Sequence, residues 1–319
     1  MSLRVIYLTR HGASFQPSLF RLTNAFAYFY PKYASNIPSP TGIAGDPALA
    51  SYGVQQSREL AAHLQNVSPP IQRIYSSPFY RCLQTVSPTV DAISTQVATD
   101  MSLKIRAENG LGEWYGVAKF NHPSPAEPLV LKELFPQLDE NYEPFVRPCS
   151  KGETIHQLHD RCAHTMKQII EQCDQDGIEA ILLCTHAATL IAIGRVLTGQ
   201  IPEDVKKEDF RPFTCGLSCF MRKTRGESGL RHERQPNSNI QVSQFDLKEN
   251  KRIGGSSWEV KLNGDCSFLS GGEERGWRFS GNESFDLELD QTSTIDAGSG
   301  LGVVIEGNHT HNAVKPPKL

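Results

Sequence analysis

Five apolar residues in succession, Ala180-Ile181-Leu182-Leu183-Cys184, indicate what kind of sheet this chain builds. The run is short, and it lacks the alternating polar residues of a strand with one face in water. Strands buried on both faces are typical of parallel sheets that are covered by helices on each side. Residues 5–8 are also apolar, with β-branched and aromatic members, and predict a second buried strand. We therefore predict an α/β protein whose mostly parallel central sheet is flanked by helices on both faces.

Strand and helix patterns alternate along most of the chain, as this class of fold requires. Further strands are predicted at 71–75, 103–106 and 216–221. Helices are predicted at 53–64, from Phe79 onward, at 154–176 and at 187–197. Irregular insertions interrupt the alternation at 15–50 and 117–150, with short helices expected near 19–28 and 129–135.

The C-terminal third departs from this alternation. We predict one domain over residues 1–289, made of a core at 1–222, a polar linker at about 223–255 and an extension at about 256–289. The extension carries several large aromatic residues on a segment too short to bury them by itself, so we expect it to pack on the core. Residues 290–319 have a low-complexity composition and are predicted to form a disordered tail.

The charge, the apolar runs and the cysteines of the sequence indicate which partners and which cellular compartment to expect. The formal net charge of −3 gives no general electrostatic case for binding nucleic acid or a membrane surface, so neither is expected as a direct partner. No apolar run approaches the roughly 18 to 20 residues that span a bilayer. Eight cysteines without a CxxC pair indicate reduced thiols and no structural zinc site. Without a secretory signal before the first strand, we expect a cytoplasmic and/or nuclear protein.

Charged and histidine side chains follow the ends of the predicted strands. They are Arg10, His11, Arg81, Glu108, Glu113 and His186. Taken singly, each has an ordinary explanation as a structural histidine, a solvated arginine or a loop carboxylate that faces water. Because the carboxyl ends of parallel strands meet at one edge of a sheet, we expect these side chains to form one active site.

This set of side chains suits phosphoryl transfer. Arg10 and Arg81 can bind phosphate oxygens and stabilise charge in the transition state. His11 can attack phosphorus and become a phosphohistidine, and His186, just before a helix, can add a donor. A carboxylic acid would protonate the leaving oxygen and then deprotonate the attacking water. No metal or other cofactor is expected, since the arginines and histidines supply positive charge and the sequence lacks a P-loop lysine motif and His/Asp metal-ligand spacing.

Four motifs together resemble the histidine phosphatase superfamily, whose members have the phosphoglycerate mutase-like fold. The motifs lie at residues 9–12, 76–85, 112–116 and 185–188. The resemblance covers about residues 3–222, and it implies a mostly parallel sheet flanked by helices. It also implies a phosphoenzyme on His11 and phosphate ligation by Arg10, Arg81 and His186. Residues 1–289 would then be a histidine phosphatase domain with its linker and extension.

A narrower resemblance involves fungal phosphatase domains: the one in a subunit of the RNA polymerase III transcription factor TFIIIC, and its stand-alone fungal relatives. It is carried by residues 77–83, 110–115, 185–188 and 263–274. It implies an alternative role as a phosphatase-like TFIIIC subunit with residual or no catalysis, which would have other TFIIIC subunits as partners. We expect a free-standing phosphatase instead, because the residues after 289 are too few for the further interaction domain of that subunit.

Two features of the site stay open at this point. Many phosphatases of this type carry an arginine or a threonine/asparagine set just after Arg-His-Gly, whereas this chain offers only Ser14 and Gln16 as added phosphate contacts. We therefore expect a less positive pocket. Alignment with mutase-like members favours Glu108 as the acid, while relatives with a Gly-Leu-x-Glu-Trp loop favour Glu113, which we prefer.

The predicted function is a metal-independent hydrolase that acts on a phosphomonoester, either a small molecule or a protein. A mutase is disfavoured, because residues 117–150 lack the basic cluster that a bisphosphate would require. The sequence indicates neither the physiological substrate nor the oligomeric state.

Overall fold

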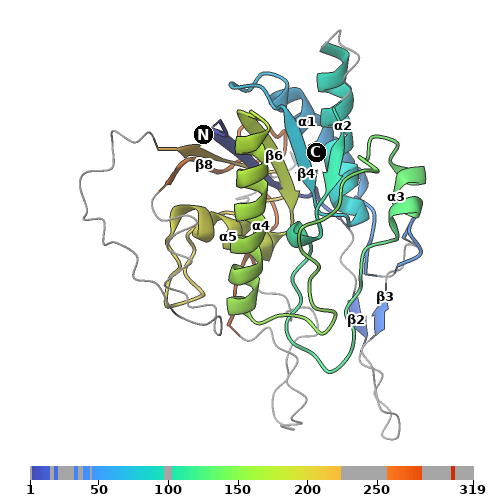
Figure 1. Ribbon diagram of the computed structural model, residues 1–319. Coiled ribbons are helices and arrows are strands. Elements are labelled where there is room, and N and C mark those ends of the chain that lie inside the picture. The colour runs from blue at the N-terminus through green and yellow to red at the C-terminus, as the bar shows by residue number, and fades with distance from the viewer. Residues whose placement is uncertain are drawn as a thin grey trace, which may run out of the picture.

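A central six-stranded sheet forms the middle of the molecule in the computed structural model (Figure 1). The structure describes residues 2–14, 18–20, 32–34, 39–43, 45–96, 103–223, 257–281 and 303–305. In spatial order the strands are β5 (Ile105–Ala107), β4 (Arg73–Ser76), β6 (Ala180–Thr185), β1 (Val5–Arg10), β7 (Leu217–Arg222) and β8 (Trp258–Asp265). The first four run parallel, while β7 and β8 are antiparallel to their neighbours. The predicted mostly parallel sheet is confirmed.

Helices cover both faces of this sheet, as predicted. The strands β1 and β6 are buried along their whole length, and successive side chains point to opposite faces. On one face, Ile6 and Leu183 pack in a core cluster with α4 (Ile155–Gln175) and α5 (Ala187–Thr198). On the other, Tyr7 and Leu182 pack with α1 (Ser51–Leu64) and α2 (Tyr80–Gln96). Figure 1 shows α4 and α5 in front of the strands.

Local sequence signals explain where several helices begin and end. The Thr154 side chain accepts a hydrogen bond from the Gln157 backbone, and the Gln157 side chain accepts one from the Thr154 backbone, which together start α4. Gly199, with φ 67°, ends α5 in the left-handed conformation. The helix α2 continues through Pro88 to Gln96, and α3 (Pro128–Leu134) lies within the second insertion, where a short helix was expected.

The first insertion differs from the expectation of a short helix near residues 19–28. Where the structure describes this segment, β2 (Ser18–Phe20) pairs antiparallel with β3 (Lys32–Ala34). The aromatic residues in these two stretches favour extended, paired backbone, which explains the error. Residues 21–31 lie outside the described residues.

The C-terminal extension contributes to the sheet and to the core. β8 is an edge strand of the central sheet, and Trp258, Trp277 and Phe279 lie in the same core cluster as α4 and α5. β10 (Val303–Ile305) pairs antiparallel with β9 (Gly276–Arg278), so the predicted disordered tail is wrong for these three residues, whose backbone groups find partners on β9. The rest of the tail and most of the predicted linker lie outside the described residues. The proposed division of the chain into core, linker and extension stays a prediction.

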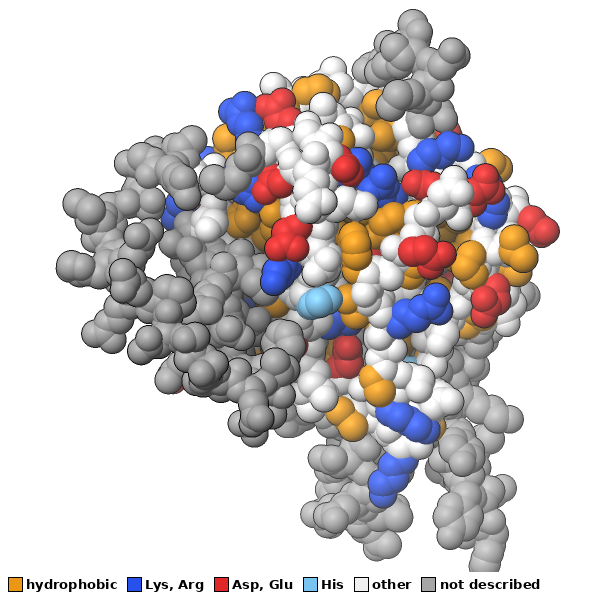
Figure 2. All heavy atoms as spheres, viewed as in Figure 1, with side chains coloured by type: hydrophobic (Ala, Val, Ile, Leu, Met, Phe, Trp, Pro, Cys, Tyr) orange, Lys and Arg blue, Asp and Glu red, His pale blue; other side chains and the backbone are white. Residues whose placement is uncertain are grey.

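The described surface mixes charges of both signs. On the face seen in Figure 2, Lys and Arg side chains alternate with Asp and Glu side chains among the described residues. Across the described parts of the chain, no helix combines the length and the apolar character that crossing a membrane requires.

Candidate active site

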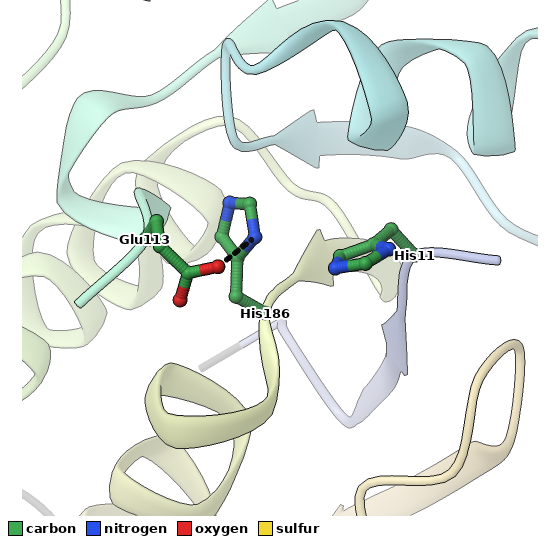
Figure 3. A group of neighbouring side chains, drawn as sticks. All are labelled: His11, Glu113 and His186. Atoms are coloured by element: carbon green, nitrogen blue, oxygen red, sulfur yellow. Dashed lines mark ion pairs between the residues drawn. The ribbon is translucent and has the colours of Figure 1, made fainter. Parts of the chain in front are cut away.

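Three parallel strands end at one edge of the sheet, and two of them are followed directly by residues of the predicted site. His11 follows β1, His186 follows β6, and Ser77 follows β4. The register of these strands aligns their last residues, so that the segments that follow lie side by side. The ring centroids of His11 and His186 are 5.2 Å apart, in an edge-on arrangement. Figure 3 shows both rings with Glu113 on the far side of His186.

Gly12 allows the segment after β1 to pack tightly against its neighbours. A Cβ atom at this position would lie 2.7 Å from the Gly53 carbonyl oxygen, which is closer than real Cβ atoms come. The Gly12 backbone N–H donates to Thr85 Oγ1 (3.0 Å), and the Thr85 hydroxyl donates to the Arg81 carbonyl oxygen (2.7 Å). The loop that carries His11 is thereby joined to the first turns of α2.

His11 is buried and oriented by one backbone hydrogen bond. Its Nδ1 lies 2.8 Å from the Gly12 carbonyl oxygen, which places the ring proton on Nδ1 and leaves the lone pair on Nε2. Burial, together with the charges of Arg81, His186 and Arg10, holds the pKa of His11 well below its ordinary value. The ring is therefore neutral at physiological pH, with a nucleophilic nitrogen 3.4 Å from Arg81 Nε.

Arg10 is a buried cation with one N–H left free. Its Nη1 donates to the carbonyl oxygens of Pro212 (2.9 Å) and Arg275 (2.5 Å). Its Nε finds no hydrogen-bond partner among the described residues. Burial lowers the pKa of Arg10 to about 10, so the side chain remains charged at neutral pH. A buried charged donor without an acceptor is costly, and an anion at this position would satisfy it.

Arg81 joins the two histidines and a carboxylate. Its Nη2 lies 2.9 Å from Glu113 Oε2 and 3.1 Å from His186 Nδ1, and its Nη1 lies 3.5 Å from Asp46 Oδ1. Burial would lower the pKa of Arg81, but the negative groups around it, of which the Glu113 carboxylate contributes most, together outweigh this effect, and the pKa is raised above its ordinary value. Arg81 is therefore a permanent cation in the centre of the cluster.

Glu113 and His186 form an ion pair at the rim of the site. Glu113 Oε2 is 3.1 Å from His186 Nδ1, and Glu113 Oε1 accepts from the Trp114 backbone (3.1 Å). Burial would raise the pKa of Glu113, but His186 and Arg81 hold it well below its ordinary value. Burial would lower the pKa of His186, but the Cys82 sulfur and Glu113 raise it. The free site thus has an ionised carboxylate next to a histidine that favours its protonated form.

Glu108, the alternative candidate for the acid, stabilises a loop through hydrogen bonds. Both of its side-chain oxygens accept hydrogen bonds, from the backbones of Gly110 (2.7 Å), Phe145 (2.9 Å) and Val146 (3.3 Å) and from the Tyr142 hydroxyl (2.6 Å). The Glu108 side chain is fully buried. These contacts join the loop after β5 to residues 142–146, and they do not bring Glu108 into the cluster of histidines and arginines.

Of the two residues expected to add phosphate contacts, Ser14 and Gln16, the structure describes only Ser14. Ser14 is buried and forms an isolated β-bridge with Leu49, and its carbonyl oxygen accepts from Arg275 Nη1 (2.9 Å). Gln16 lies outside the described residues.

A metal ion would use the same three side chains that Figure 3 shows. Ligand atoms of His11, Glu113 and His186 all lie within 4.8 Å of one another. The Arg81 guanidinium, however, lies within 3.4 Å of an atom in each of the three. A fixed positive charge in that position disfavours a cation and favours an anion with several oxygens. The arrangement therefore suits a phosphoryl group better than a metal.

Comparison with known sequences shows the family of this chain. The sequence model of the histidine phosphatase superfamily (branch 1) matches residues 6–232, which include every residue of the cluster. The chain belongs to this superfamily.

Two individual proteins are similar to much of this chain. The chain is 30% identical over 294 residues to the transcription factor tau 55 kDa subunit of Saccharomyces cerevisiae, which covers 88% of this chain and 59% of the yeast subunit. It is 28% identical over 223 residues to the ecdysteroid-phosphate phosphatase of Drosophila melanogaster, which covers 64% of this chain and 28% of the fly protein. The chain thus spans less than two thirds of the length of either relative.

One solved structure supports the fold. The crystal structure of the ecdysone phosphate phosphatase of Bombyx mori, in complex with tungstate, superposes with a TM-score of 0.50 and 21% sequence identity. The match covers 77% of this chain and 98% of the silkworm chain. At this identity the likeness shows the fold alone.

Sequence reasoning missed several residues that shape the site. Asp46 accepts two hydrogen bonds from the Tyr80 backbone at the start of α2, and Ser77 Oγ lies 2.8 Å from His186 Nε2. Ser77 lies within the motif at residues 76–85, so its position in the sequence could have indicated a role in the site. Arg275 gave no such signal, because only the path of the extension brings it close to Arg10.

Proposed function

We propose that this protein is a metal-independent phosphomonoesterase that works through a phosphohistidine on His11. One observation carries the proposal: a neutral His11, whose unprotonated Nε2 accepts a long hydrogen bond from Arg81 Nε, lies beside Arg10, a buried cation whose Nε has no acceptor among the described residues. A nucleophile and cations of this kind match a phosphoryl group, which carries several negative oxygens.

The geometry supports a two-step reaction. Arg10, Arg81 and His186 would bind the phosphoryl oxygens, and His11 Nε2 would attack phosphorus as the bond to the leaving oxygen breaks. Glu113 would give a proton to that oxygen. A water molecule, deprotonated by Glu113, would then break the phosphorus–nitrogen bond, releasing inorganic phosphate and restoring His11.

Glu113 has to gain a proton before it can act as an acid. Its pKa is well below its ordinary value in the free site because His186 and Arg81 stabilise the carboxylate. A bound phosphate group would bring negative charge close to the carboxylate and would share these cations, and both effects raise the pKa of a carboxylic acid. Substrate binding would thus prepare Glu113 for proton transfer.

A cavity next to Glu113 supports a sizeable leaving group. It has a volume of about 540 Å³ and lies between the loop after β5 and the insertion at 117–150. Phe79, Tyr115, Leu131 and Tyr142 are among the residues that line it. The walls also carry several charged residues, so we expect a phosphomonoester of a bulky alcohol that combines apolar and polar groups. The name of the fly relative, an ecdysteroid-phosphate phosphatase, is consistent with such a substrate class.

A labelling experiment tests the phosphohistidine. Brief reaction of the wild-type protein with a radioactive phosphomonoester should leave an acid-labile, base-stable phosphoryl group, and His11→Ala should acquire none. His63→Ala is the matched control, because His63 lies at the end of α1 and stacks on Phe268, outside the cluster. Label on His11→Ala equal to that on the wild type would refute the proposal.

A second role is supported by one observation. Similarity to the yeast transcription factor tau subunit extends over 88% of this chain, well beyond the region that the family model matches. Under this role the protein would be a nuclear, phosphatase-like component of a TFIIIC-type complex, with residual or no catalysis. Purification from native extract distinguishes the two roles: stoichiometric recovery with large transcription-factor subunits supports the second, and an active, unassociated protein supports the first.

A further inference from the structure

The C-terminal extension places an arginine, Arg275, beside Arg10 of the candidate site. Arg275 lies in the loop between β8 and β9, outside the region that the family model matches. Its carbonyl oxygen accepts from Arg10 Nη1 (2.5 Å), and its own Nη1 donates to the Ser14 carbonyl oxygen (2.9 Å). Arg275 thus contacts both the residue before His11 and the segment that follows Gly12.

The charge of Arg275 is not neutralised by an ion pair in the described structure. Among the described residues, no carboxylate lies within ion-pair distance of its guanidinium, although Arg211 and Arg278 of the same region have such partners in Glu273 and Glu208. The positive charge of Arg275 lowers the pKa of Arg10, as does that of Arg81. Cations gathered around a buried, partly unsatisfied guanidinium repel one another unless an anion lies between them.

The backbone conformation of Arg275 also supports a role for its side chain. Its φ of 52° is in the left-handed region, which a residue with a side chain rarely adopts. Glycine would adopt this conformation without strain, and glycines stand at 271, 272 and 276 around it. An arginine kept at a position that suits glycine indicates a use for its side chain.

We propose that Arg275 is a substrate-binding residue that contacts the phosphoryl oxygens from the solvent side and supplies the cation that the segment after Arg-His-Gly lacks. The proposal rests on the phosphatase function proposed above. Ser14 and Gln16 bring no charge to the pocket, whereas the Arg275 guanidinium is exposed, is held next to Arg10 and keeps several N–H donors free of the Ser14 contact. The extension would therefore complete the active site as well as the sheet.

The sharpest variant is Arg275→Gly, since it removes the guanidinium and keeps the backbone free of strain. Arg275→Gln removes the positive charge but keeps most of the side-chain length. If both variants lose affinity, the loss is due to the missing guanidinium and not to a change in the structure of the loop. Arg278→Gln is the matched control, because Arg278 is an arginine three positions along that pairs with Glu208. For each protein we would measure the Kd of inorganic phosphate and of tungstate by calorimetry, the kcat and KM with a chromogenic phosphomonoester, and the melting temperature.

Both Arg275 variants should bind inorganic phosphate and tungstate about tenfold or more weakly, with a similar loss in kcat/KM and an unchanged melting temperature. Arg278→Gln should match the wild type. Three outcomes would overturn the inference. The first is that both variants bind phosphate and tungstate with affinities within twofold of the wild type. The others are that both variants fail to fold, or that the wild type binds neither anion. Binding is measured without turnover, so a wild type that binds phosphate through Arg275 but forms no phosphohistidine would contradict the phosphatase proposal alone.

Discussion

His11 and Glu113 show how burial and nearby charges give ordinary side chains distinct tasks. His11 is kept neutral by burial and by three neighbouring cations or histidines, which keeps an unprotonated Nε2 that accepts a long hydrogen bond from Arg81 Nε. Glu113 is kept ionised by His186 and Arg81. The same cations thus act on both the proposed nucleophile and the proposed acid.

Replacement of Glu113 by glutamine should separate the two chemical steps. A nitrophenolate leaves without much help from an acid, but hydrolysis of the phosphohistidine still requires a base. We expect Glu113→Gln to lose about 100-fold or more in kcat with nitrophenyl phosphate, and to release a burst of one nitrophenolate per active site. Rapid-mixing absorbance and trapping of the phosphoprotein would measure this.

Glu108→Gln provides the contrast. Because Glu108 accepts four hydrogen bonds from the loop at 142–146 and its surroundings, its loss should lower the melting temperature without producing a burst. A burst in Glu108→Gln and none in Glu113→Gln would reverse the assignment.

The activity should fall on the alkaline side of neutrality. The pKa of His186 is raised above its ordinary value of 6.5, so its protonated, donating form persists to a higher pH than in a free imidazole and is lost as the pH rises through the raised pKa. His11 has a lowered pKa and stays neutral as the pH falls through 6.5, so it should cause no loss there. A profile of kcat from pH 5 to 9 checks both statements.

His186→Gln is the informative comparison for that profile. Glutamine donates a hydrogen bond at every pH, so this variant should have a lower kcat but a weaker alkaline decline than the wild type. An unchanged alkaline decline in His186→Gln would assign the titration to another group.

At the scale of elements, the contact between the end of β1 and the start of α1 determines where His11 lies. Gly12 and Gly53 approach so closely that neither tolerates a Cβ atom. Thr85, on α2, binds the Gly12 N–H from the other side. Two helices therefore hold the segment that carries His11 from two directions.

Gly12→Ala should damage both stability and activity. The added Cβ would lie 2.7 Å from the Gly53 carbonyl oxygen, and the backbone would have to move. Overpacking of this kind costs about 1–3 kcal/mol of the free energy of unfolding, and a shift of about 1 Å at His11 could cost about 100-fold in kcat. Thermal melting and steady-state kinetics would test this, and a variant with wild-type values of both would show that the segment adapts freely.

At the scale of the whole molecule, the extension at residues 257–281 packs on the core as part of the same domain. β8 extends the central sheet beyond β7, and Trp114 contacts Phe279 with ring centroids 5.5 Å apart. The loop between β8 and β9 reaches Arg10 through Arg275. Residues separated by most of the chain length are therefore combined in one site.

Truncation should show how much stability the extension provides. A chain ending at residue 250 loses β8 and the buried aromatics Trp258, Trp277 and Phe279, so its melting temperature should fall strongly, since burial of one such side chain is worth about 3–5 kcal/mol. A chain ending at residue 292 loses only β10 among the described elements and should melt close to the full chain. Equal melting curves for the two truncations would show that the extension adds nothing to the fold.

Local patterns were enough to predict the architecture and most of the site. A strand such as β6 is recognisable because burial on both faces leaves five of its residues in a row apolar, from Ala180 to Cys184, and amphipathic helices such as α4 are recognisable by their period. Because parallel strands end at a common edge, the short motifs after β1, β4 and β6 could be expected to meet. The structure does bring Arg10, His11, Arg81, Glu113 and His186 together, and their catalytic roles remain proposals.

What required the tertiary structure was every feature that depends on contacts between distant segments. Glu108 and Glu113 are equivalent carboxylates in one loop, and only the positions of Tyr142 and residues 145–146 show that Glu108 is taken up by structural hydrogen bonds. The strand β10 and the hairpin of β2 and β3 depend on which partner each short segment finds. Arg275 stands 264 positions after His11 in the sequence, and its approach to Arg10 follows from the return path of the extension through β8, because chain connectivity and packing, not local propensity, decide which distant side chains become neighbours.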